Sequence, residues 1–371
     1  MEKINSADKR ILSVDVLRGF DMFWLIGGTG IALAIVKLFG GRVQDILLPQ
    51  FDHCEWVGFT FYDLIFPLFE FVMGMSVVFS LQKILGKEGK ATAYRRLIKR
   101  FVLLFLLGII YYGGVSNSWP DIRILGVLQR LALTYLLTGI IFIHLDLKWM
   151  VVVSAALLIF YWILLCFVPV PDTGIASLTP ESNWAQYIDA KFLPGKKNGP
   201  GGLWDIVGIL GTLPATVSCL LGVFAARILS SKKMEDKQRL ICLIGGGLVM
   251  VVTGYLWGIQ FPVIKKVWSS TYVLVGGGYS MMLMGIFYYL IDMKEYKKWT
   301  LMFVWIGVNP ITIYMARNLI DFNGPAKRLV GGDIASMVGE QWAYFLATAV
   351  SLGFSLIILR FLYNRKIFIK V

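Results

Sequence analysis

Charged side chains are scarce in this sequence. Only 16% of the 371 residues are Asp, Glu, Lys or Arg, whereas about a quarter is typical of a soluble domain. Hydrophobic residues make up 57% of the chain, and its mean hydropathy is +0.70. This composition excludes an ordinary soluble domain. Apolar runs of about 20 residues recur along the chain, which is typical of a helical protein that crosses a membrane several times.

Cysteine and histidine are also rare, with four and two residues respectively. Cys166, Cys219 and Cys242 lie inside apolar runs, so the sequence has neither a disulfide framework nor a metal-ligand spacing. Walker A, H-E-x-x-H, G-x-S-x-G and paired C-x-x-C motifs are absent as well. We therefore expect no metal ion, and no enzyme class that depends on one of those motifs.

Ten apolar runs predict an all-α bundle of membrane-spanning helices, formed by a single domain over residues 1–371. If the spans alternate, five basic clusters fall on one side, so this side is cytoplasmic and holds both termini. Basic loops that face anionic lipid explain the net charge of +13, and we expect membrane lipid rather than nucleic acid as a partner. The predicted spans are 11–37, 59–85, 97–115, 123–144, 147–168, 205–229, 240–260, 271–291, 300–320 and 341–363.

His53 has the clearest chemical potential of any residue. It lies on the predicted outer side, just before the second span. An imidazole titrates near neutrality, so it can move a proton or carry an acyl group. Asp63, about one turn inside that span, can accept the ring N–H and fix its tautomer. Two plainer interpretations stay open here: a histidine that only binds a loop, and a carboxylate that only caps a helix.

Other polar residues lie inside the predicted spans, where an ionised side chain costs at least about 3 kcal/mol. Asp15 and Arg18 share one helical face in the first span. Pro67 can bend the second span between Asp63 and Glu70. A polar interior open to the outer side suits an acyltransferase and a transporter equally. Other residues that contribute to this polar interior, inside or just outside the spans, are Gln129, Arg130, Lys265, Lys266, Trp268 and Asn309.

A long outer segment, residues 169–204, is rich in proline, glycine and aromatic residues. Segments of this length are usually functional when they belong to a compact domain. It is expected either to line a site for a bulky polar substrate or to be a simple connector.

Several distinctive strings occur in order along nearly the whole chain. Together they resemble the heparan-alpha-glucosaminide N-acetyltransferase family and its bacterial relatives, and the block from His53 to Gly74 is the most specific part. The strings are Ser13-Val-Asp15-Val-Leu-Arg18-Gly19, His53-x-x-Trp56-x-Gly58-x-Thr60-x-x-Asp63, Arg123-Ile-Leu-Gly126-Val-Leu-Gln129-Arg130, Phe261-Pro262-Val-Ile-Lys265-Lys266-Val-Trp268 and Gly307-Val-Asn309-Pro310.

This resemblance implies a transmembrane acetyltransferase in a bacterial inner membrane. Members of the family move an acetyl group from cytoplasmic acetyl-CoA to an amino sugar on the far side. The family's proposed catalytic histidine matches His53, and a carboxylate ten residues later matches Asp63. The residues expected to bind donor or acceptor are Asp15, Arg18, Thr29, Trp56, Gln129, Arg130, Lys265, Lys266, Trp268 and Asn309.

One departure from the family pattern and several alternatives bear on this expectation. Relatives commonly carry an asparagine late in the first span, where this chain reads Gly27-Gly28-Thr29, so the polar group is either missing or supplied by Thr29. His53 either deprotonates the acceptor amine or becomes acetylated itself. The alternative functions are an amino-sugar or cell-wall-fragment permease without acyl transfer, and a non-catalytic subunit of an envelope complex. A homodimer is compatible with the sequence.

Overall fold

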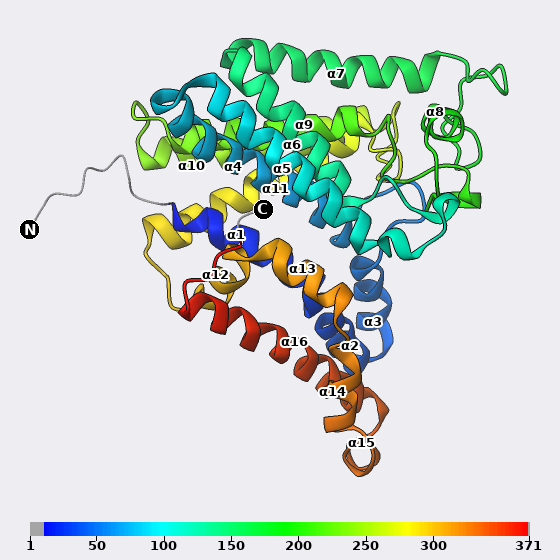
Figure 1. Ribbon diagram of the computed structural model, residues 1–371, viewed down its shortest axis with the longest axis vertical. Coiled ribbons are helices and arrows are strands. Elements are labelled where there is room, and N and C mark those ends of the chain that lie inside the picture. Colours follow the sequence, from blue (N-terminus) through cyan, green and yellow to red (C-terminus); the bar gives the residue numbers. More distant parts are fainter. Residues whose placement is uncertain (1–10, 370–371) are drawn as a thin grey trace, which may run out of the picture. The chain divides into compact units, whose positions relative to one another are not determined.

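Helices dominate the computed structural model (Figure 1), which describes residues 11–369. Within this range there is no strand, and β-type pairing is limited to two isolated bridges. The predicted all-α class is confirmed. The α-helices are α1 (Leu12–Phe23), α2 (Thr29–Phe39), α3 (Gly41–Leu47), α4 (Ile65–Lys87), α5 (Gly89–Tyr111), α6 (Val127–His144), α7 (Leu147–Phe167), α8 (Trp184–Phe192), α9 (Thr212–Leu229), α10 (Asp236–Trp257), α11 (Ser270–Phe287), α12 (Leu301–Val308), α13 (Pro310–Leu319), α14 (Asn323–Val330), α15 (Asp333–Val338) and α16 (Glu340–Asn364).

Eight continuous helical segments of the described chain are long and apolar enough to cross a membrane. They confirm the prediction of a polytopic membrane protein, while the side on which the termini lie stays a prediction. The segments are Leu12–Phe39, Phe61–Lys87, Val127–His144, Leu147–Phe167, Thr212–Leu229, Asp236–Trp257, Ser270–Met293 and Glu340–Asn364.

Two of the ten predicted spans take a different form. The third corresponds to α5, whose first half carries the basic run from Arg95 to Arg100 and only then becomes apolar. The ninth is divided into α12 and α13 at Asn309, whose backbone is not helical (φ −133°, ψ 46°). Pro310 begins α13 at a position where its missing N–H costs nothing, so the break follows from the Asn-Pro pair.

The chain divides into two compact units, each built from separate stretches of sequence. Among the described residues, unit 1 contains 11–38, Met234–Ile244 and 282–369, and unit 2 contains Phe39–Lys233 and Gly245–Met281. The prediction of a single domain over residues 1–371 stays a prediction.

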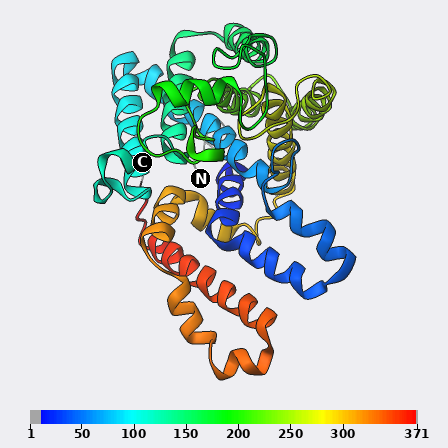
Figure 2. The ribbon, with the colours of Figure 1, turned by 90° about the vertical axis from the view of Figure 1, so that its right-hand side faces the viewer.

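Close helix packing holds unit 1 together. A Cβ atom on Gly19 of α1 would lie 1.8 Å from the Phe303 carbonyl oxygen of α12, and one on Gly307 would lie 2.1 Å from the Asp15 carbonyl oxygen. Only glycine allows the two backbones to approach this closely. Figure 2 shows the second feature of this unit, the hairpin from α13 to α16.

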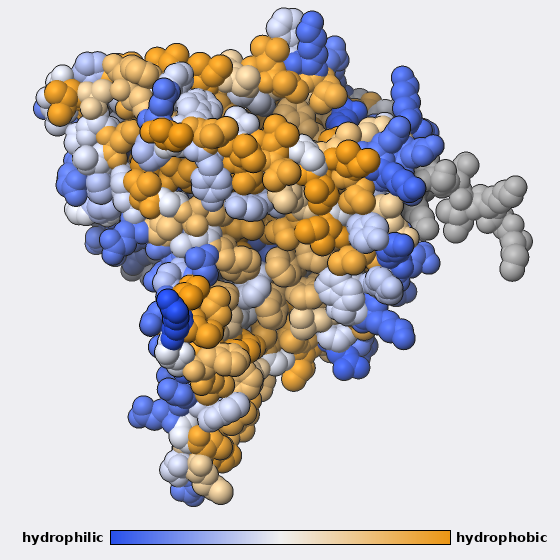
Figure 3. All heavy atoms as spheres, turned by 180° about the vertical axis from the view of Figure 1, so that it is seen from behind, coloured by the Kyte–Doolittle hydropathy of each residue, from blue (hydrophilic) through white to orange (hydrophobic). Residues whose placement is uncertain are grey.

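The centre of unit 2 is the crossing of α4 and α9. A Cβ atom on Gly74 would lie 1.8 Å from the Cys219 carbonyl oxygen, and one on Gly222 would lie 1.8 Å from the Phe71 carbonyl oxygen. Both helices are mostly buried, whereas α7 exposes Ile159, Phe160 and other large apolar side chains. Figure 3 shows hydrophobic residues spread over one face of the molecule, as a surface in contact with lipid requires.

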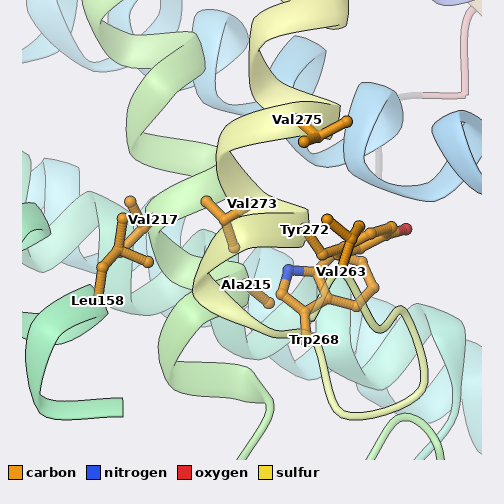
Figure 4. Packing of buried hydrophobic residues seen from close by; sticks show 8 residues of the cluster. All are labelled: Leu158, Ala215, Val217, Val263, Trp268, Tyr272, Val273 and Val275. Atoms are coloured by element: carbon orange, nitrogen blue, oxygen red, sulfur yellow. The ribbon is translucent and has the colours of Figure 1, made fainter. Parts of the chain in front are cut away.

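A hydrophobic cluster in unit 2 fixes the loop between α10 and α11 (Figure 4). Trp268 belongs to this cluster and has 1% of its surface exposed. Its indole N–H donates to the Ser218 hydroxyl at 3.2 Å, and its ring packs edge-on against Phe66 and Tyr272. Anchored in this way, the loop holds Lys265 in a defined place. The other cluster members are Leu158, Ala215, Val217, Val263, Val273 and Val275.

Candidate active site

His53 and Asp63 lie together at the start of the second membrane-spanning segment. The ring nitrogen Nδ1 is 2.8 Å from the Asp63 oxygen Oδ1. The Asp63 side chain is fully buried, whereas 44% of the His53 side chain is exposed. A carboxylate that is fixed in the protein thus orients an imidazole that solutes can reach, which is the geometry of an oriented base.

The second oxygen of Asp63 organises the loop that carries His53. It accepts the backbone N–H of Cys54 at 3.3 Å and that of Thr60 at 3.1 Å. Both donors precede Asp63, so the carboxylate holds the loop rather than the first turn of α4. Gly58 completes the loop with φ +134°, a conformation that side chains disfavour, and its N–H donates to Val263 at 2.9 Å.

Lys265 is the third member of the site. Its Nζ atom lies 2.8 Å from Nδ1 and 3.2 Å from Nε2 of His53, and 3.3 Å from Oδ1 of Asp63. Burial lowers the pKa of Lys265 to about 8, although the charge of Asp63 acts in the opposite direction. We call His53, Asp63 and Lys265 the trio. No comparable contact in the described chain joins Lys266 to it.

Aromatic and sulfur-containing neighbours complete the site. The Tyr62 ring lies against the His53 ring at a centroid distance of 4.7 Å and an interplanar angle of 30°. Trp56 donates its indole N–H to the Leu178 carbonyl at 2.9 Å, which ties the outer segment 169–204 to the His53 loop. Burial raises the pKa of the Cys54 thiol to about 11, so this thiol stays protonated and is a poor nucleophile.

Gln129, Arg130 and Trp268, which sequence analysis expected to bind substrate or donor, lie deeper in unit 2. All three side chains are buried, and Trp268 is part of the hydrophobic cluster of unit 2. The Arg130 guanidinium donates to the Gly208 carbonyl at 3.1 Å and lies 4.9 Å from the Trp268 ring. None of the three forms a hydrogen bond with the trio in the described structure.

The remaining expected site residues belong to unit 1, where each has local hydrogen bonds. Arg18 donates to Asp15 at 3.2 Å and to the Gly307 carbonyl at 3.3 Å. The Thr29 hydroxyl donates to the Trp24 carbonyl one turn earlier. The Asn309 amide binds the backbone of residues 367–369 at both its oxygen and its nitrogen. Their assignment as ligand-binding residues stays a prediction.

Sequence reasoning did not single out Thr60 or Tyr62 as site residues. Thr60 stands in the string from His53 to Asp63, and its spacing of three residues from Asp63 was the available signal. The position of Tyr62 against the imidazole depends on the path of the loop, which has no signature in the sequence. Among residues 11–369, no group of three or more His, Cys, Asp or Glu side chains could hold a metal ion.

The fold and the trio define a polytopic helical membrane protein with a histidine–carboxylate–lysine site. A family model described as "Domain of unknown function (DUF5009)" matches residues 10–159. The chain is 26% identical over 446 residues to heparan-alpha-glucosaminide N-acetyltransferase of Mus musculus, covering 100% of this chain and 62% of that protein. For the Homo sapiens protein of the same name, the identity is 27% over 424 residues, covering 100% of this chain and 61% of the relative. The chain is thus similar over its whole length to two heparan-alpha-glucosaminide N-acetyltransferases, at modest identity, and the predicted resemblance is confirmed. It spans about three-fifths of the length of these relatives.

Proposed function

We propose that this protein is a transmembrane N-acetyltransferase. It transfers the acetyl group of acetyl-CoA to the amino group of an amino sugar on the outer side of the membrane. The observation that carries this proposal is the trio, because it places an exposed imidazole against a buried carboxylate. The names of the two relatives support the reaction type and the class of acceptor.

His53 acts as the base in this reaction. It takes a proton from the neutral acceptor amine as the nitrogen lone pair attacks the thioester carbonyl. The carbon–sulfur bond then breaks, and the proton passes from the imidazolium to the departing thiolate, which leaves as CoA thiol. In the alternative route, an imidazole nitrogen attacks the thioester first and expels the CoA thiolate. The acetylimidazole then passes its acetyl group to the amine, and the proton that the amine loses goes to the thiolate. Asp63 stabilises the imidazolium in both routes.

The length of α4 supports a reaction across the membrane. This helix has 23 residues, which corresponds to about 34 Å at 1.5 Å per residue, and the hydrocarbon core is about 30 Å thick. The trio lies at the N-terminal end of α4. A basic cluster lies at its C-terminal end and in the start of α5, and consists of Lys87, Lys90, Arg95 and Arg96. We place the cluster in the cytoplasm, where it would meet the phosphates of the donor, and the trio outside.

We expect labelling with a membrane-impermeant maleimide to reproduce this topology. In a background without the four native cysteines, Lys196→Cys should react in intact cells, because the outer segment is exposed on the same side as the trio. Lys233→Cys, which lies in a predicted cytoplasmic loop, should react only after the membrane is opened. Labelling of both positions from one side would contradict the topology and the transfer across the membrane.

The function itself is tested with purified protein in detergent or vesicles. We expect labelled acetyl-CoA and a panel of amino sugars to give an N-acetylated sugar, while acetyl-CoA should also raise the melting temperature by mass action. A protein that takes up amino sugars into vesicles, forms no acetylated product and does not respond to acetyl-CoA would instead be a permease.

A further inference from the structure

Lys265 holds its ammonium over the face of the His53 ring. Its Nζ atom lies 2.8 Å from Nδ1 and 3.2 Å from Nε2. The two ring nitrogens direct their hydrogen bonds within the ring plane and away from each other, so a donor placed on one of them would be far from the other. The nearly equal distances therefore put the ammonium above the plane, where it leaves both in-plane positions open.

Asp63 occupies one of these two positions. Its Oδ1 atom is 2.8 Å from Nδ1, so the proton of the neutral ring lies on Nδ1 and the lone pair on Nε2. Among residues 11–369, Lys265 is the one group within hydrogen-bond distance of Nε2, and 44% of the His53 side chain is exposed. Nε2 is thus the nitrogen that meets the substrates, with a cation 3.2 Å away from it.

Negative charge develops near Nε2 in both routes of the proposed transfer. When a nucleophile bonds to the thioester carbon, the π electrons of the carbonyl group move onto its oxygen. They return when the carbon–sulfur bond breaks and the thiolate leaves. The nucleophile is either Nε2 itself or the amine whose proton Nε2 takes, so the oxyanion forms close to this nitrogen. A cation fixed at such a place is usually among the largest contributions to the rate.

We propose that Lys265 stabilises the oxyanion of the acetyl transfer, which makes it the third catalytic residue beside His53 and Asp63. The inference rests on the proposed function and assigns the group that stabilises its transition state. The ammonium donates a hydrogen bond to the oxyanion and keeps its own protons throughout. The proton of the acceptor amine is still handled by His53.

The surroundings of Lys265 hold this cation in place before the reaction begins. Its Nζ atom lies 3.3 Å from Oδ1 of Asp63, and its side chain is only 16% exposed. Trp268 anchors the loop that carries it in the hydrophobic cluster. An ammonium has three N–H groups, so the contact with one carboxylate oxygen leaves donors for a substrate. Little reorganisation is then needed when the oxyanion forms.

The charge of Lys265 should make this contribution depend on pH. The groups that face its ammonium are His53, Asp63 and the protonated thiol of Cys54. Burial lowers the pKa of Lys265 to about 8, although the charge of Asp63 acts in the opposite direction. The ammonium is therefore lost as the pH rises through that value, and oxyanion stabilisation is lost with it.

Rate ratios isolate this pH effect, because the titration of the acceptor amine cancels in them. The ratio of the wild-type rate to the Lys265→Met rate should fall as the pH rises through about 8. The ratio of the Lys265→Arg rate to the Lys265→Met rate should stay constant over the same range, since a guanidinium keeps its proton. A wild-type ratio that does not change with pH would contradict a role for the charge.

Steady-state kinetics provide a second test. Lys265→Met should lower kcat by about 10²–10³-fold, the usual effect of removing one oxyanion donor. KM for acetyl-CoA and for glucosamine should change little, because the oxyanion exists only in the transition state. An acetyl-CoA-dependent melting temperature shows that the variant is folded. Lys196→Met removes an exposed lysine that has no contact with the trio, so it should keep the wild-type kcat.

Chemical restoration of the charge provides a third test. In the background without the four native cysteines, whose own rate is the reference, Lys265→Cys should be as slow as Lys265→Met. Alkylation of the new thiol with bromoethylamine creates a lysine analogue of the same length, and most of the lost rate should return. Iodoacetamide adds a neutral group to the same thiol and should leave the rate low.

These outcomes separate the inference from the function on which it rests. A Lys265→Met protein with the wild-type kcat, or equal recovery with the charged and the neutral group, would overturn the catalytic role. A raised KM with an unchanged kcat would overturn it as well, because Lys265 would then bind substrate without stabilising the transition state. If wild-type protein itself forms no acetylated sugar, the proposed function fails and the inference fails with it.

Discussion

His53→Ala is expected to abolish acetyl transfer while leaving the protein folded and able to bind acetyl-CoA. The variant loses the proton acceptor of the reaction, and the loss of a positioned general base typically costs about 10²–10⁴-fold in rate. The side chain is 44% exposed, so its removal leaves no buried cavity. Initial rates with a fixed acceptor measure the first effect, and the acetyl-CoA-dependent melting temperature measures the second.

The neighbouring residues provide matched controls for this prediction. Asp63→Asn should cost less than removal of the ring, because His53 remains but its tautomer is no longer enforced. His144→Ala should keep the wild-type rate, since its ring contacts Tyr94 and has no part in the trio. A His53→Ala protein that acetylates amino sugars at the normal rate would refute the role of His53 and the strongest argument for an enzyme.

Sequence reasoning could place His53 near Asp63 because the two residues are only ten positions apart, at the start of the same predicted span. It could not place Lys265, which is 212 residues from His53 and reaches it through the tertiary fold. The resemblance to a family marked Lys265 and Lys266 alike. Only the structure distinguishes them, because the loop anchored at Trp268 directs one of the two toward the imidazole.

Polar residues inside apolar runs were harder to interpret. Thr29 and Asn309 looked like candidates for ligand binding, yet their side chains hydrogen-bond to the backbone of their own unit. A sequence pattern shows that a polar group lies in a span. It does not show whether backbone or ligand satisfies that group, since both make the same hydrogen bonds.

The fold was predictable to the extent that hydropathy determines it. Long apolar runs predicted most of the helices, whereas the predicted ninth span is divided into α12 and α13 at the Asn309–Pro310 pair. The sixth span was predicted to start at Asp205, but α9 begins at Thr212. The reason lies in side-chain hydrogen bonds: Asp189, in α8 of the outer segment, accepts the backbone N–H groups of Asp205 and Ile209 and holds this stretch in turns.

Asp205 also takes part in a buried ion pair whose removal should strongly destabilise unit 2. The Arg123 guanidinium donates two parallel hydrogen bonds of 2.8 Å to its carboxylate, and the side chains are 10% and 0% exposed. The same carboxylate accepts the backbone N–H groups of Asn198 and Val207. The pair therefore fastens the outer segment to the chain that leads into α6.

Arg123→Met is expected to lower the free energy of unfolding by about 3–5 kcal/mol, because it leaves a buried carboxylate without its cation. The double variant Arg123→Met/Asp205→Asn should recover part of this loss, since the neutral amide keeps an acceptor for the backbone without a buried charge. Chemical denaturation in detergent, followed by tryptophan fluorescence, gives the coupling energy of the pair from the two single variants and the double variant.

The exposed pair of Lys297 and Glu295 is the matched control for that cycle. These side chains are 43% and 64% exposed and 3.1 Å apart, so Lys297→Met should cost only about 0–1 kcal/mol. If Arg123→Met cost as little as Lys297→Met, the buried pair would not be what holds the outer segment.

If Arg123→Met is destabilising as expected, it should also disturb the trio. Trp56 binds the Leu178 carbonyl of the outer segment, so a loosened segment leaves the His53 loop without one of its supports. Transfer by Arg123→Met should then fall at temperatures below its unfolding transition and return in the double variant, because the same ion pair determines both stability and the shape of the site.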